Sequence, residues 1–123
     1  MLLKFLRSVL MTLGLLASAP AWAEDAPRFL SVIEDLPLMA ALSEVGEGVQ
    51  FSTSQGRIAE VMTQGRVSAS EVLAFYEGTL PQLGWTRLGR GRFAREEETL
   101  ELGIEDSGQN LNVRFTLAPK NKP

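Results

Sequence analysis

The sequence predicts an α+β domain in which a mainly antiparallel sheet carries one principal helix, at about residues 68–83, on one face. Two observations predict it. A capped amphipathic segment stops at Pro-x-x-Gly-Trp, and two later segments alternate apolar and polar residues, as strands with one covered face do. The chain shows no internal repeat and no low-complexity linker, so we expect one domain.

Residues 1–23 have the three parts of a secretory signal. Lys4 and Arg7 form a charged start, the apolar run SVLMTLGLLA follows, and Ala21-Trp22-Ala23 is a small-x-small cleavage triplet. The run is well short of the roughly 20 residues that span a bilayer, so we expect cleavage rather than an anchor, and no membrane span afterwards. No cysteine follows the run to accept a lipid. The sequence therefore predicts a periplasmic domain at residues 24–123, with full secretion as the alternative.

The mature chain is acidic and contains neither cysteine nor histidine. Loss of residues 1–23 leaves ten basic residues against fifteen acidic ones, a net charge of −5. A nucleic-acid partner is not expected, because such proteins rely on a basic surface. Thiolate, imidazole and the usual zinc chemistry are excluded. We therefore expect no cofactor, no metal site and no enzyme activity, and a carboxylate-based hydrolase is the one enzyme class left open.

Residues 29–45, FLSVIEDLPLMAALSEV, leave two alternatives open. In the first, Asp35 caps a short helix that has Pro37 in its first turn and Gly46 beyond its end. In the second, the segment is an extended arm across the core, and Pro37 fixes its bend. Either structure should partly bury its apolar residues.

A β-hairpin is predicted next, over residues 49–65. VQFS alternates apolar and polar residues, TSQG has turn chemistry, and RIAEVMT forms the second strand, which ends at Gly65.

The helix has sequence signals at both ends. Ser68 and Glu71 match a capping box, in which each side chain satisfies a backbone N–H at the helix start. Pro81 cannot donate a backbone hydrogen bond, so we expect a kink or a tightened last turn, and Gly84 should adopt the left-handed conformation that ends the helix. Trp85 should then pack on the apolar stripe. This stripe comprises Val72, Phe75, Tyr76, Leu80 and Leu83.

After Trp85 the sequence predicts four short strands. Thr86–Leu88 and Arg92–Ala94 flank the turn GRG, and Thr99–Glu105 and Leu111–Leu117 flank DSGQN. In the second pair, placing Ile104 opposite Leu111 makes every inward residue face another inward residue. The same register sets Glu101 opposite Arg114, an opposite-charge pair on the outer face.

The acidic residues of this region are the only candidates for acid–base chemistry. They are Glu96, Glu97, Glu98, Glu101, Glu105 and Asp106. We expect them on a solvated surface, where no desolvation raises a pKa. The segment Asp106–Asn110 lacks the alternating oxygen ligands of a calcium loop, so it is interpreted as a β-turn.

Two candidate binding sites follow from residue type and spacing. Arg87, Arg90, Arg92 and Arg95 form a positive patch that could bind anionic headgroups, glycans or an acidic partner, unless residues 96–98 neutralise it. A second site is a small cavity between helix and sheet for an apolar or amphiphilic ligand. Its rim would comprise Tyr76, Trp85 and Phe115, although such aromatic residues are more often part of a core.

The block VLAFYEGTLPQLGW, from Val72 to Trp85, resembles a segment of small exported bacterial domains of unknown function. In that segment Phe-Tyr, Leu-Pro and Gly-Trp pairs end a helix that leads into antiparallel strands. GRIAEVMTQGRVS and EDLPLM resemble the same family, so the likeness covers most of the mature chain. It implies a fold but no activity and no site residues.

Two function hypotheses result. The first is a non-catalytic interaction module of the cell envelope, which engages a partner protein through the arginine patch or by strand addition at an exposed sheet edge. The second is a small binding protein for the apolar or amphiphilic ligand. The sequence leaves the oligomeric state open.

Overall fold

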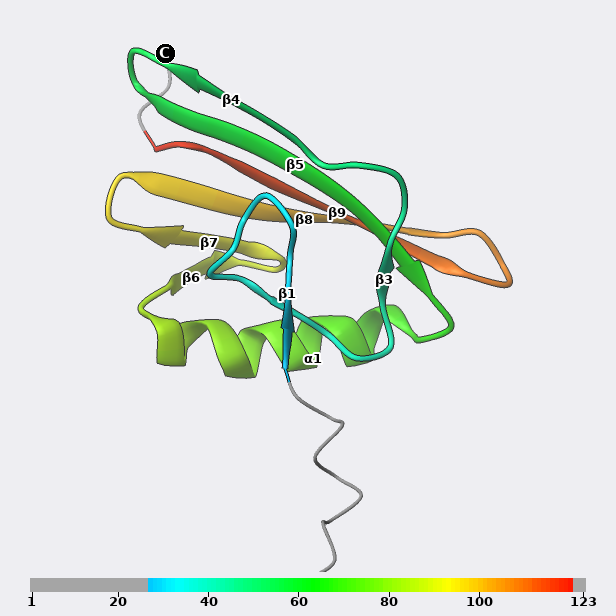
Figure 1. Cartoon of the computed structure of the whole chain (residues 1–123). Coiled ribbons are helices and arrows are strands. Elements are labelled where there is room, and N and C mark those ends of the chain that lie inside the picture. Colours follow the sequence, from blue (N-terminus) through cyan, green and yellow to red (C-terminus); the bar gives the residue numbers. More distant parts are fainter. Residues whose placement is uncertain (1–26, 121–123) are drawn as a thin grey trace, which may run out of the picture.

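Within residues 27–120, a seven-stranded antiparallel sheet and one α-helix form two layers, which confirms the predicted α+β fold class (Figure 1). The computed structural model describes residues 27–120, so the predicted leader at residues 1–23 lies outside the described part. The strands are β1 (Arg28–Phe29), β2 (Pro37–Leu38), β3 (Ser43–Glu44), β4 (Val49–Thr53), β5 (Gly56–Gly65), β6 (Thr86–Gly89), β7 (Arg92–Arg95), β8 (Glu98–Asp106) and β9 (Leu111–Pro119). The sheet order is β3-β5-β9-β8-β7-β6, with β4 also paired to β5, while β1 and β2 form a separate ribbon.

The helix α1 (Ala69–Thr79) begins as the sequence predicts. The Glu71 N–H donates to the Ser68 hydroxyl over 3.1 Å, and the Ser68 N–H donates to the Glu71 carboxylate over 3.1 Å. These bonds complete the capping box, which satisfies donors that no earlier turn of helix can pair.

The helix ends in the tightened turn expected from Pro81. A 3₁₀ segment, η2 (Leu80–Leu83), continues α1 and stops at Gly84, whose φ is +96°. The Trp85 N–H donates to the Leu80 carbonyl over 3.1 Å, as in a Schellman stop. The prediction that Leu83 is buried is wrong, because Leu83 is 41% exposed. The chain reverses at Gly84, and Trp85 rather than Leu83 enters the core at this end.

Residues 27–48 form a non-helical arm, so the helical alternative for residues 29–45 is wrong. The arm is not extended throughout, because it turns at residues 31–36 and β1 pairs antiparallel with β2. The arm crosses the open side between α1 and the sheet (Figure 1). Its partners lie far away in sequence: the Tyr76 hydroxyl donates to the Pro37 carbonyl over 2.8 Å and accepts the Met39 N–H over 3.0 Å. Phe29 and Val45 at its two ends are exposed. Five leucine or isoleucine side chains between them are buried, namely Leu30, Ile33, Leu36, Leu38 and Leu42.

The β8–β9 hairpin has the predicted strands but not the predicted register. Ile104 lies opposite Val113 instead of Leu111, and Glu101 lies opposite Thr116 instead of Arg114. A shift of two residues keeps each side chain on its face, so the apolar pattern cannot distinguish the two registers. The observed register closes with a turn over residues 107–110, where the Ser107 N–H donates to the Asn110 carbonyl over 2.9 Å.

Candidate functional site

The five residues Val49–Thr53 of β4 form a sheet edge that we call the β4 edge. β4 pairs with β5, and within residues 27–120 no strand pairs with its other side (Figure 1). All five residues are exposed. Because an antiparallel ladder uses the backbone groups of alternate residues, the outward N–H and C=O groups remain available to another extended chain.

The apolar side chains of the β4 edge lie on the sheet face that α1 does not cover. Phe51 is opposite Ile58 in the ladder, and Val49 is opposite Glu60. Directly opposed residues share a face, whereas the next residue, Ala59, points to the core and is buried. Val49 is 54% and Phe51 53% exposed, so an added strand would find apolar surface beside the free backbone groups.

A tight turn holds β4 in its extended conformation. The Thr53 hydroxyl donates to the Gly56 carbonyl over 2.7 Å and accepts the Gln55 N–H over 3.1 Å. Gly56 has a φ of +141°, a conformation that a residue with a Cβ rarely adopts. The edge is therefore ordered before any partner arrives, which reduces the entropy lost on binding.

The opposite edge of the sheet is protected. A register shift between Arg87 and Gly89 interrupts the ladder of β6 with β7. Arg87 also places a charge on this edge. Bulges and charged side chains are devices that prevent unwanted strand pairing, and β4 has neither a bulge nor a charge.

Three of the four arginines of the predicted positive patch are engaged within the chain. Arg87 pairs with Glu77 of α1 at 2.9 Å, and Arg92 pairs with Glu101 of β8 at 3.4 Å. Arg95 pairs with Asp35 of the arm. Arg90 lies at the turn between β6 and β7 and makes no ion pair among the described residues. The carboxylates that pair with these arginines are therefore not Glu96–Glu98, the neutralising residues suggested by sequence proximity.

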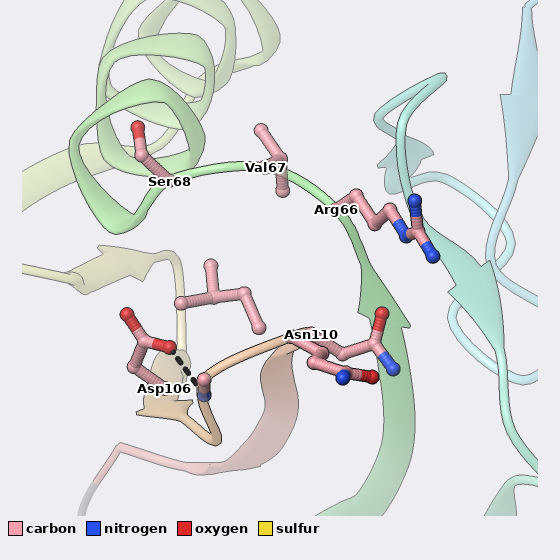
Figure 2. A pocket seen from close by; sticks show the side chains of 8 residues that line it. Arg66, Val67, Ser68, Asp106 and Asn110 are labelled. Atoms are coloured by element: carbon pink, nitrogen blue, oxygen red, sulfur yellow. Dashed lines mark hydrogen bonds between the residues drawn. The ribbon is translucent and has the colours of Figure 1, made fainter.

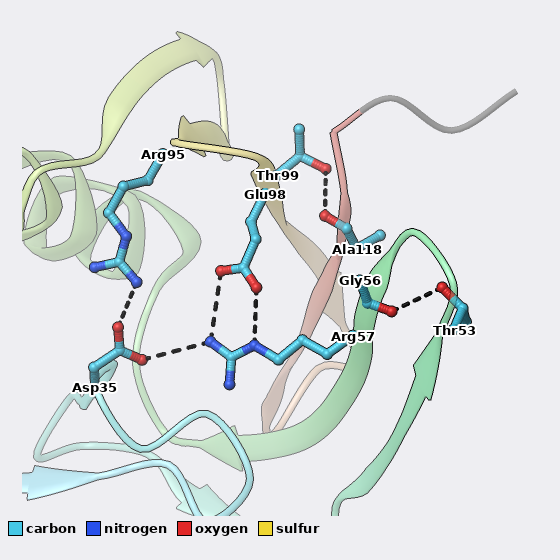
Figure 3. A network of polar contacts seen from close by, with 8 residues as sticks. All are labelled: Asp35, Thr53, Gly56, Arg57, Arg95, Glu98, Thr99 and Ala118. Atoms are coloured by element: carbon cyan, nitrogen blue, oxygen red, sulfur yellow. Dashed lines mark hydrogen bonds and ion pairs between the residues drawn. The ribbon is translucent and has the colours of Figure 1, made fainter.

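A polar network fastens the arm to the sheet (Figure 3). Arg57 of β5 binds the Glu98 carboxylate with its Nε at 2.9 Å, and its Nη2 lies 4.0 Å from Asp35, which also binds Arg95. Partial burial raises the pKa of Asp35. The hydrogen bond and the charge of Arg95, together with the smaller effect of the Arg57 charge, outweigh burial and leave the pKa below its ordinary value. The hydrogen bond to Glu98 raises the pKa of Arg57.

The aromatic residues expected at a ligand-cavity rim lie in the core instead. Tyr76 and Phe115 are 0% exposed and Trp85 is 2% exposed. The Tyr76 and Phe115 rings meet edge to face with centroids 5.2 Å apart, and the Arg95 guanidinium lies 4.3 Å from the Trp85 ring centroid. Burial raises the pKa of Tyr76 to about 12. Because these rings contact one another and the core, they do not border an open cavity.

Three of the six acidic candidates, Glu98, Glu101 and Asp106, make side-chain contacts within the chain. Glu98 binds Arg57, and one Asp106 oxygen accepts the Gly108 N–H over 2.9 Å, which confirms a turn at Asp106–Asn110. In residues 27–120 no group of three or more His, Cys, Asp or Glu side chains could hold a metal ion.

Beside this turn, residues 66–68, Asp106 and residues 108–111 line an open cleft of about 530 Å³ (Figure 2). The Arg66 side chain points away from Asp106, and the capping box occupies donors at the helix start, so the cleft presents no converging set of free polar groups.

Comparison of the chain with protein-family models, with curated proteins and with solved structures gives no match. Among the described residues, no helix has the length and apolar character needed to cross a membrane.

Proposed function

We propose that this chain is a non-catalytic interaction module of the bacterial cell envelope, which engages a partner protein by strand addition at the β4 edge. The signal pattern at residues 1–23 supports export to the periplasm, and the absence of histidine and cysteine from the sequence argues against most enzyme chemistry.

One observation carries the proposal: the sheet has one protected edge and one unprotected edge. An exposed edge that is ordered, uncharged and apolar on one face is a hazard for a soluble protein unless a partner uses it. Strand addition uses such an edge, because backbone hydrogen bonds supply affinity and alternate side chains supply specificity.

The arginine patch supports partner binding less well than the β4 edge does. Arg87, Arg92 and Arg95 already hold carboxylates of the chain, so an anionic partner would have to displace them. Arg90 is the one member without an ion pair in residues 27–120, and a single exposed charge contributes little affinity.

Site-specific photo-cross-linking in intact cells tests the proposal. A photoreactive residue replaces Ser52, within the β4 edge, or Gln109, at the exposed tip of the β8–β9 turn. We expect a discrete higher-mass product from position 52 and none from position 109.

A second substitution provides the matched control. Phe51→Lys puts a charge on the β4 edge and should abolish the product, whereas Leu88→Lys puts the same charge on β6 and should leave the product unchanged. The two variants are matched because the original side chains are similarly exposed, at 53% and 49%. Comparable urea midpoints would show that both variants remain folded. The absence of a position-52 product, or its persistence in Phe51→Lys, would overturn the proposal.

A further inference from the structure

We infer that the strand which the β4 edge accepts is the β4 strand of a second copy of this chain, paired antiparallel about a two-fold axis at Phe51. This inference rests on the proposed function and names its partner. A two-fold interface must be self-complementary, so the sequence of β4 can be tested against itself.

The sequence VQFST is self-complementary in the antiparallel register centred on Phe51. In that register Val49 lies opposite Thr53, Gln50 opposite Ser52, and Phe51 opposite Phe51 of the second copy. The cross-strand pairs are therefore β-branched with β-branched, small polar with polar, and aromatic with aromatic. The aromatic pair is among the stabilising cross-strand pairs of antiparallel sheets, and the other two pairs oppose no like charges.

Charge favours this contact over others between two copies of an acidic chain. The full chain has a net charge of −3, so most approaches of one copy to another bring acidic surfaces together. Residues 48–56, GVQFSTSQG, contain no charged side chain. The two-fold register therefore places no like charges opposite each other along the seam.

The outer face of the sheet adds apolar contact to the backbone pairing. Phe51 of each copy would meet Phe51 of the other, and the partly buried Ile58 lies directly behind it in the ladder. A seam of five residues buries less than the roughly 1,200–2,000 Å² of a stable standard-sized interface. The dimer should therefore form reversibly and depend on protein concentration.

Sedimentation equilibrium over a wide range of concentration measures this association, with full-length protein expressed with its leader and purified from the cells. We expect a monomer–dimer equilibrium for the wild type. Phe51→Lys and Phe51→Glu should each weaken the association on the order of tenfold or more, because residue 51 faces itself and like charges oppose each other. Leu88→Lys should associate like the wild type.

A mixture of Phe51→Lys and Phe51→Glu tests the register itself. The introduced lysine and the introduced glutamate oppose each other only in the mixed dimer, so an equimolar mixture should associate more strongly than either variant alone and should lose this gain at high salt. Dimers that persist in both single variants, or a mixture that behaves as the average of its parts, would overturn the inference.

The photo-cross-linking experiment separates this inference from the proposed function. A monomer at every concentration, together with a position-52 product that contains a different envelope protein, overturns the inference and leaves the proposed function standing. A monomer that also gives no position-52 product overturns both. A position-52 product at twice the mass of the chain supports both.

Discussion

The Tyr76 hydroxyl joins the arm to the helix, and Tyr76→Phe removes only this hydroxyl. The side chain is 0% exposed, and its oxygen donates to Pro37 over 2.8 Å and accepts from Met39 over 3.0 Å. Phenylalanine preserves the ring and its contact with Phe115, so no large cavity forms. Each lost hydrogen bond costs about 0.5–1.5 kcal/mol net, so we expect the free energy of unfolding to fall by about 2 kcal/mol. For a domain of this size, that loss lowers Tm by about 10 °C.

Thr63→Val is the matched control for this loss. Thr63 is also 0% exposed, but its hydroxyl makes one bond, to the Val113 carbonyl at 2.9 Å, so the expected loss is about 1 kcal/mol. Urea unfolding followed by circular dichroism measures both variants, and the dependence of stability on urea should not change, because neither variant alters the buried area. A Tyr76→Phe loss no larger than the Thr63→Val loss would refute the two-bond argument.

Three further predictions concern titration and the helix end. Tyr76 is the one tyrosine, and its pKa of about 12 lies above the ordinary value of about 10, so stability should fall as the pH rises from about 10 to 12. Tyrosinate absorbance near pH 10 in a folded protein would contradict this. Asp35→Asn should lower the free energy of unfolding at neutral pH by up to about 1 kcal/mol. The difference from the wild type should vanish as the pH falls through the lowered pKa of Asp35, because only the ionised carboxylate stabilises the fold. A difference that does not change with pH would exclude this mechanism. Gly84→Ala should destabilise the fold by about 1 kcal/mol, because Gly84 has a φ of +96°. Gly78→Ala should stabilise it by about 0.5 kcal/mol, because Gly78 lies in α1 with open space around it. Urea midpoints that move in the same direction for both variants would contradict this prediction.

The helix and its two ends could be predicted because their signals are local. Ser68 and Glu71 are three residues apart, and Pro81, Gly84 and Trp85 specify the stop within one turn. The failures concern contacts between distant residues. Both structures proposed for residues 29–45 satisfy the local pattern, and the choice between them depends on bonds to Tyr76, more than thirty residues away.

In the candidate site too, local features could be predicted and contacts between distant residues could not. Sequence proximity suggested that Glu96–Glu98 neutralise the arginines, but Arg95 pairs with Asp35, sixty residues away in sequence. The two-residue error in the β8–β9 register arose because alternation has a period of two. The β4 edge had a usable signal, since GVQFSTSQG is uncharged and VQFS alternates, but only the sheet order shows that no other strand of the described residues covers it.

The place of β9 within the sheet bears on how the chain is made. β9 lies between β5 and β8, so it joins the hairpin of β4 and β5 to the strands that follow the helix, yet it is the last strand in the described sequence. A growing chain that has not yet released residues 111–119 lacks the middle of its sheet, and its two flanking pieces have no direct strand contact. The sheet of the described residues can therefore close only once residues 111–119 are available, and until then its two halves have no strand between them.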